Sequence, residues 1–266
     1  MFKKIYVLIK ILRKFSTSGA VDTIDEIKPL PKILKFFFFL FSLGKNDKIN
    51  DLNRTSGEKL CIALQGMGTT FIKLGQFLAT RPDIIGDDVA KKLEKLQDKL
   101  PAFGTAEAKE ILKKEIGQKS FDNITELKDP IAAASIAQVH FAKAKIDGVE
   151  KELAIKILRP NIHHTVNEEL DALMFVAYTI ENFFKKTKRL KLVEVIYLLK
   201  EITNIEMDLR FEAAAASELY ENTKNDSYIK VPKIYWGYTS KQVLALDKID
   251  EISIRDLDRL RKEGVD

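Results

Sequence analysis

The sequence is poor in the residues that build disulfide frameworks and metal centres. Its 266 residues include a single cysteine, Cys61, and three histidines, at positions 140, 163 and 164. One cysteine excludes an intramolecular disulfide and a cysteine-rich zinc site, and three clustered histidines do not predict a metal site either. We therefore expect no metal site in this chain, and a buried, reduced thiol of the kind found in a reducing compartment.

Long apolar runs are also missing. The longest, residues 33–43 (ILKFFFFLFSL), includes Lys35, and a helix of that length rises only about 16 Å, half of a bilayer core. Residues 1–15 (MFKKIYVLIKILRKF) make a poor secretory signal, because Lys10 interrupts the apolar stretch and no small-residue cleavage site follows. These segments predict neither a membrane span nor a cleaved leader.

Acidic residues are scarce only at the N-terminus. Residues 1–35 contain eight lysines and arginines against three acidic residues, which accounts for the whole net charge of +5. Two interpretations stay open: basic, phenylalanine-rich helices suit the surface of an anionic membrane, or the same segments pack against the body of the protein. The first implies a peripheral location at the inner, cytoplasmic face of a membrane. A nucleic-acid partner is not expected, because the rest of the chain is charge-balanced and carries no nucleic-acid motif.

Helix signals dominate the first part of the chain, and strand signals begin after residue 120. Thr-Ser-Gly-Glu at 55–58 has the spacing of a capping box that starts a helix. Asp147-Gly148 is typical of a hairpin turn. The pattern predicts helices at 55–65, 69–80, 87–100 and 105–117, strands at 121–126, 138–145 and 152–158, helices at 161–186 and 190–221, and strands at 229–235 and 242–246.

This order of elements leads to the fold prediction. Three strands, long helices and two further strands are the layout of a protein-kinase N-lobe, so we expect an α+β fold with a five-stranded antiparallel sheet. The expected parts are a basic, aromatic segment at 1–50, a helical extension at 51–120, the kinase-like N-lobe at 121–250, and the hinge with the start of a C-lobe at 251–266.

Lys156 is the first candidate for chemistry. It ends the predicted strand Leu-Ala-Ile-Lys, and in kinases a Val-Ala-Ile-Lys strand places its lysine on the α- and β-phosphates of ATP. Where a kinase has a glycine-rich phosphate loop, this chain has alanines, whose Cβ resists the positive φ that brings backbone amides close to phosphate. A helix N-terminus is the alternative interpretation. The candidate nucleotide-binding residues of this loop are Ala132, Ala133, Ala134, Ser135, Ile136 and Ala137.

Further motifs follow one another in a fixed order. Lys73-Leu74-Gly75-Gln76 and Arg81-Pro82-Asp83 precede residues 132–140 (AAASIAQVH), and Glu206-Met207-Asp208 precedes Glu212. In this order, over residues 55–250, the chain resembles the UbiB family of atypical kinases. There the same motifs are the Lys-x-Gly-Gln signature, the alanine-rich loop, the Glu-x-Asp motif and the C-helix glutamate. Residues 231–236 and 243–249 resemble that family's last two N-lobe strands and hinge, with Asp247 in place of the usual hinge glutamate.

The resemblance implies an activity and its cofactors. Members of this family are kinase-like ATPases or lipid-linked kinases that bear on ubiquinone (coenzyme Q) biosynthesis, and they bind ATP and Mg²⁺. In this chain Lys156 would hold the phosphates of ATP and Glu212 would orient Lys156. No flavin, haem or iron site is expected. The implied partners are ubiquinone-biosynthesis proteins or lipid intermediates.

The resemblance also implies a second lysine site. Glu206 and Asp208 would anchor Lys73, whose helix occludes the side on which a protein substrate would bind, and Gln76 shares a helical stripe with Lys73. Glu206 and Glu212 are six positions apart, so on a helix they point in directions about 120° apart and can meet two different lysines.

The residues that phosphoryl transfer requires are not found in the sequence after the hinge. A catalytic-loop Asp, a metal-binding Asn and an Asp-Phe-Gly-type Asp are needed, and residues 253–266 contain no such motifs. We expect the C-lobe to be absent from this chain, no catalytic residue in it, and no ATP hydrolysis by the isolated chain. Either a separate polypeptide supplies the C-terminal half, or the chain is a non-catalytic, membrane-associated remnant or a regulatory scaffold of the ubiquinone pathway.

Overall fold

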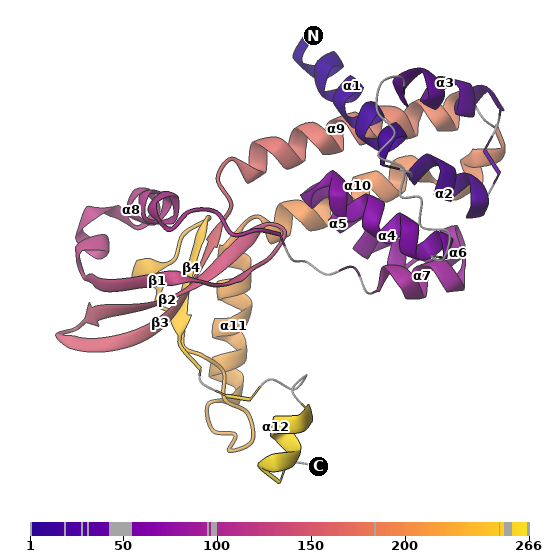
Figure 1. Cartoon of the computed structure of the whole chain (residues 1–266). Helices are drawn as coiled ribbons and strands as arrows, with labels where there is room; N and C mark the ends of the chain where they lie inside the picture. The colour runs from indigo at the N-terminus through magenta and orange to yellow at the C-terminus, as the bar shows by residue number, and fades with distance from the viewer. Residues whose placement is uncertain are drawn as a thin grey trace. The chain divides into compact units, whose positions relative to one another are not determined.

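The computed structural model consists of two compact units, each described separately below (Figure 1). It describes residues 2–18, 20–27, 29–30, 32–42, 55–94, 96, 100–183, 185–249, 251–252 and 257–264. The first unit comprises Met1–Pro101, Ala133–Ala137 and Arg159–Met207. The second comprises Ala102–Ala132, Gln138–Leu158 and Asp208–Asp266.

The first unit is helical. Its core is formed by large apolar side chains that are almost fully buried, among them Leu64, Phe71, Leu93, Leu170 and Leu199. Its described elements are α1 (Phe2–Thr17), α2 (Ala20–Ile27), α3 (Lys32–Ser42), α4 (Ser56–Met67), α5 (Thr69–Ala79), α6 (Pro82–Ile85), α7 (Asp87–Leu93), α9 (Ile162–Phe183), the 3-10 helix η1 (Lys185–Leu190) and α10 (Leu192–Glu206). Over the described ranges, no helix combines the length and the apolar character that crossing a bilayer demands.

Local sequence signals place α4 and α5. Thr55 accepts a hydrogen bond from the Glu58 backbone while the Glu58 side chain accepts one from the Thr55 backbone, so the predicted capping box is confirmed. Gly68 then adopts φ 104° between the two helices, a conformation that a residue with a Cβ rarely takes. The predicted helix at 87–100 is shorter than expected, since α7 ends at Leu93.

The second unit holds the sheet. Its elements are α8 (Thr105–Asp122), β1 (Ile124–Ala133), β2 (Ala137–Ile146), β3 (Val149–Leu158), α11 (Leu209–Thr223), the 3-10 helix η2 (Trp236–Tyr238), β4 (Val243–Asp247) and α12 (Leu257–Lys262). The strands lie in the order β1-β2-β3-β4. Asp147 and Gly148 both have positive φ, 52° and 78°, as the predicted two-residue hairpin turn between β2 and β3 requires.

Strand alternation separates the two faces of this sheet. Ile155 and Ile157 are buried with Leu112 of α8 in one apolar cluster. Successive side chains of a strand point to opposite faces, so Lys156 projects from the other face. β3 pairs antiparallel with β4, with Lys156 opposite Leu244. Figure 1 shows α8 and α11 flanking this sheet.

The α+β architecture is confirmed, with further differences from the expected elements. The described sheet has four strands instead of five, because residues 229–235 contribute only a single bridge, Ile234 to Leu246. Pro232 stands in this segment and has no N–H for a ladder. The predicted helix at 190–221 is two helices, α10 and α11, because Asp208 adopts an extended backbone and caps α11.

Candidate functional site

The predicted contact between Lys156 and Glu212 is present. Lys156 lies near the end of β3, and its Nζ donates to Oε2 of Glu212 in the first turn of α11 over 2.7 Å. The lysine side chain is 27% exposed and that of the glutamate is 50% exposed. A pair this exposed contributes about 0–1 kcal/mol to stability. Its main effect is therefore to fix where the ammonium group lies.

Asp208 determines where α11 begins. Its carboxylate accepts from the backbone N–H of Arg210 over 3.2 Å, and from Nε and Nη2 of the same residue over 2.9 and 2.6 Å. The Arg210 guanidinium holds the pKa of this carboxyl below its ordinary value. The described hydrogen bonds of Asp208 thus serve the start of α11, and its expected part in anchoring Lys73 stays a prediction.

Lys73 and Glu206 form the second ion pair that was expected. Within the first unit, Lys73 of α5 places Nζ 2.9 Å from Oε2 of Glu206, the last residue of α10. The lysine side chain is 14% exposed and the glutamate side chain 35% exposed. The Oε2 atom itself is buried, and its contact with Nζ lacks the angles of a hydrogen bond. The pair therefore acts mainly through charge, in a partly desolvated place.

Packing explains the glycine of the Lys-x-Gly-Gln motif. A Cβ added at Gly75 would clash with Leu96 Cδ1 and would lie 2.8 Å from Leu64 Cδ1. The glycine therefore lets α5 approach its neighbours closely. Gln76 is half-buried, and among the residues that the structure describes no hydrogen-bond partner of its side chain is found.

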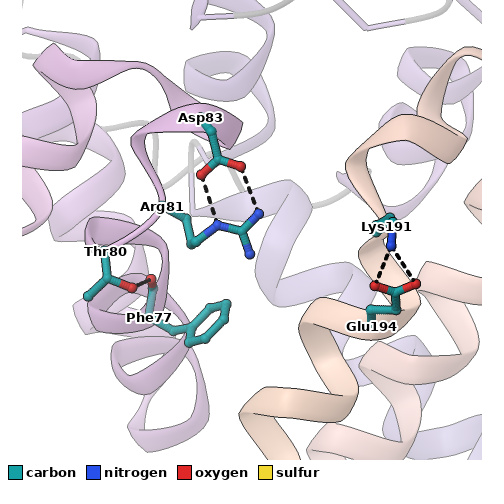
Figure 2. A network of polar contacts seen from close by, with 6 residues as sticks. All are labelled: Phe77, Thr80, Arg81, Asp83, Lys191 and Glu194. Carbon is teal, nitrogen blue, oxygen red and sulfur yellow. Dashed lines mark hydrogen bonds and ion pairs between the residues drawn. The ribbon is translucent and has the colours of Figure 1, made fainter.

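The Arg-Pro-Asp motif after α5 starts the short helix α6, with Arg81 at its N-cap and Pro82 as its first residue. Figure 2 shows the Arg81 guanidinium facing the Asp83 carboxylate, with Nε to Oδ1 at 2.8 Å and Nη2 to Oδ2 at 2.7 Å. Thr80 donates back to the Phe77 carbonyl over 2.8 Å at the end of the same helix. The contacts between Arg81 and Asp83 stay within the motif, which points to a structural task for these two residues.

The alanine-rich loop is a tight turn between β1 and β2. The Ala134 N–H donates to the Ala137 carbonyl over 2.8 Å. Ser135, Ile136 and Ala137 are buried, and Ala132 is exposed. Because strands lie on both sides of this turn, the alternative interpretation as a helix N-terminus is wrong.

Sequence reasoning missed the structural residues around this loop. Gln138 accepts from the Phe103 N–H over 2.9 Å and donates to the Phe103 carbonyl over 3.1 Å and to His140 Nε2 over 2.9 Å. His140 Nδ1 lies 2.7 Å from the Lys128 carbonyl. A carbonyl only accepts, so Nδ1 carries the proton and Nε2 accepts from Gln138. These buried groups join the segment before α8 to the sheet.

Arg159 is a further residue that was not singled out. It follows β3 by one residue, and its guanidinium donates to the Ala134 carbonyl through Nε and Nη2 over 3.1 and 2.8 Å. Nη1 donates to the Pro101 carbonyl over 2.9 Å. An arginine directly before Pro160 in the sequence was the only available signal, and it does not predict these partners.

Near the expected hinge, Asp247 binds the segment before it. Tyr235 donates its hydroxyl hydrogen to Asp247 Oδ1 over 2.6 Å, and the Lys233 N–H donates to Oδ2 over 3.2 Å. Burial, and then the hydrogen bond to Asp247, raise the pKa of Tyr235 to about 12. The carboxylate that replaces the usual glutamate is thus engaged within the lobe.

Comparison with known proteins agrees with this geometry. Residues 95–266 match the family described as the ABC1 atypical kinase-like domain. "Probable protein kinase UbiB" of Marinobacter nauticus is 37% identical over 248 residues, which are 92% of this chain and 44% of that protein. The proteins of the same name from Histophilus somni and Cellvibrio japonicus are 35% and 34% identical, over 97% of this chain and 47% and 45% of their own lengths.

The matches cover most of this chain but only part of each relative. The chain spans less than half the length of these curated relatives, so the activity of a whole relative is not carried over with the match. The family match, in contrast, covers more than half of this chain and includes Lys156, Glu212 and the complete described sheet. The chain belongs to the family of ABC1 atypical kinase-like domains.

Proposed function

We propose that this chain supplies the ATP-binding lobe of a UbiB-type atypical kinase or ATPase that acts in ubiquinone biosynthesis. The observation that supports this most directly is the 2.7 Å contact between Lys156 on β3 and Glu212 on α11. A strand lysine held by a helix glutamate is the arrangement that kinases need before ATP can be aligned. The name of the relatives, "Probable protein kinase UbiB", supports the choice of pathway.

In this proposal each residue of the pair has a separate task. The Lys156 ammonium contacts the α- and β-phosphates, and Glu212 limits the positions that the flexible lysine side chain can take. Because the pair is partly exposed, Lys156 can reach phosphate oxygens without first leaving a dry environment. Mg²⁺ would neutralise charge on the phosphates when bound. The described residues bring no three metal-ligating side chains together, so we assign Mg²⁺ no ligand among them.

Nucleotide binding by the whole chain tests this function. A fluorescent ATP analogue titrated into the chain should bind, and Lys156→Ala should weaken binding at least about tenfold, because a charge-assisted contact to phosphate is lost. Lys151→Ala removes an exposed lysine from the same strand and is the matched control. Equal affinity of Lys156→Ala and the unaltered chain would exclude the proposed role.

We also propose an anionic membrane surface as a partner of the first unit. Phe36, Phe39 and Leu40 are exposed along one side of α3, while Phe38 of the same helix stacks on Phe15 of α1 at 6.2 Å between ring centroids. One face of α3 is thus packed, and another carries apolar side chains that are largely exposed to solvent. Exposed cations at Lys10, Arg13 and Lys32 accompany this face in the sequence, a combination that suits lipid headgroups with buried aromatic rings.

A further inference from the structure

Three successive carbonyls of the alanine-rich loop are held by side chains and backbone of the first unit. The Ala134 carbonyl accepts from Nε and Nη2 of Arg159. The Ser135 carbonyl accepts from Thr69 Oγ1 over 2.9 Å. The Ile136 carbonyl accepts from the backbone N–H of Arg159 over 2.8 Å. All of these residues belong to the first unit.

These contacts fix the orientation of the loop as well as its position. A guanidinium presents its N–H groups in a rigid planar fork. Two hydrogen bonds from this fork to the Ala134 carbonyl oxygen therefore define the direction in which that carbonyl points. The Nη1 bond to the Pro101 carbonyl prevents the fork from turning. The bond between Ala134 N–H and the Ala137 carbonyl closes the turn from inside. Peptide planes with held carbonyls also have fixed N–H directions.

The same helix that carries Lys73 also carries one of these contacts. Thr69 is the first residue of α5, and Lys73 lies four positions later, on the same side of the helix. Thr69 thus binds the loop one turn before Lys73 meets Glu206. The conformation of the loop is therefore tied to α5 through side chains of one unit.

We propose that Arg159 and Thr69 are positioning residues that hold the alanine-rich loop in one conformation. In a glycine-rich kinase loop the backbone is free to move over the phosphates. Here the contacts of Arg159 and Thr69 hold the loop in one conformation, which is the conformation that it would present to a nucleotide. The part of this proposal that concerns nucleotide rests on the proposed function, whereas the part that concerns loop rigidity does not.

Amide hydrogen exchange on the whole chain tests the rigidity. Arg159→Lys keeps the charge but loses the fork, so the N–H groups of Ala134 and residue 159 should exchange about tenfold faster or more. The amides of β3 and β4 should keep their protection. Arg81→Lys removes a fork whose hydrogen bonds, among the residues that the structure describes, go to Asp83, and it is the matched control. Unchanged exchange of the loop in Arg159→Lys would overturn the proposal.

Thr69→Val provides a second variant in case Arg159→Lys folds poorly. It removes one hydroxyl with little change of volume and should loosen the loop by a smaller factor. Thr80→Val is its control, because Thr80 donates only to the carbonyl of Phe77 in its own helix. If the amides of the alanine-rich loop exchange at equal rates in Thr69→Val and Thr80→Val, Thr69 does not restrain the loop.

Nucleotide kinetics then separate the two proposals. If the fixed loop shapes the site, Arg159→Lys should change the association and dissociation rates of the ATP analogue by about fivefold or more, while Lys156→Ala weakens affinity without loosening the loop. A looser loop with unchanged nucleotide rates would refute the role in binding and leave the rigidity result standing. If the unaltered chain does not bind the ATP analogue, the proposed function is refuted. The hydrogen-exchange data would still show whether Arg159 and Thr69 hold the loop in one conformation.

Discussion

Lys73 Nζ and Glu206 Oε2 lie 2.9 Å apart and join α5 to the end of α10. The contact links two segments more than a hundred positions apart in the sequence, and it leaves the lysine 14% exposed. Solvent therefore screens this pair less than a fully exposed one, so loss of either partner leaves a charge that water reaches only in part.

Glu206→Ala should consequently lower the free energy of unfolding by about 2 kcal/mol. This is less than the 3–5 kcal/mol of a fully buried pair, because about a third of the glutamate side chain is exposed. Urea denaturation of the whole chain measures the loss. Glu194→Ala breaks the largely exposed pair with Lys191 (Figure 2) and should cost about 0–1 kcal/mol. Equal losses in the two variants would contradict a special environment for Lys73.

Both lysine–glutamate pairs could be predicted from the order of the motifs, whereas the single helix expected to carry Glu206 and Glu212 is wrong, because α10 ends at Glu206 and α11 begins at Leu209. Lys156 lies two residues before the end of β3, and Glu212 follows the N-capping Asp208 by four positions, so each backbone element fixes one side-chain direction. The break between Glu206 and Glu212 was missed, because Asp208 reads as an ordinary helix residue until its bond to Arg210 is seen.

Other features depend on contacts that no local pattern contains. Arg159 meets carbonyls 25 and 58 positions away, and an arginine after a strand carries no sign of such partners. The missing fifth strand is a related case, since residues 229–235 contain strand-favouring residues such as Ile229 and Val231 but contribute a single bridge. Register and long-range side-chain partners are tertiary properties, which strand propensity does not determine.

The hydrogen bond between Tyr235 and Asp247 predicts a pH effect. The folded state raises the pKa of Tyr235 from 10.0 to about 12, so this tyrosine binds its proton more tightly folded than unfolded. Its contribution to stability is complete below pH 10 and is lost as the pH rises from about 10 to about 12. Tyr235→Phe should remove this decline, which urea denaturation at a series of pH values measures.

Two further variants test the cause of that shift. Asp247→Asn removes the negative charge and should lower the pKa of Tyr235 only in part, because burial is the larger cause. The titration of Tyr235 is followed by the absorbance of tyrosinate as the pH is raised through about 12. Tyr228→Phe removes an exposed phenol and should leave this absorbance change in place. If the tyrosinate absorbance change near pH 12 persists in Tyr235→Phe, the raised pKa belongs to another tyrosine.

The final prediction concerns the apolar face of α3. Phe39→Ser should reduce binding to vesicles that contain anionic lipid by about tenfold or more, because one aromatic ring contributes on the order of 2 kcal/mol when it leaves water. Phe211→Ser in the second unit is the matched control, since both phenylalanines are 59% exposed. Flotation of the whole chain with such vesicles, repeated at rising salt, measures the partition.

The salt series distinguishes a lipid surface from nonspecific stickiness. Cations near the exposed rings attract anionic headgroups over about 8–10 Å at moderate ionic strength, so binding should weaken as salt rises. A purely hydrophobic adsorption would strengthen or stay constant instead, and would be equal on zwitterionic vesicles. Either of those results, or equal binding of Phe39→Ser and Phe211→Ser, would remove α3 as a membrane-binding surface.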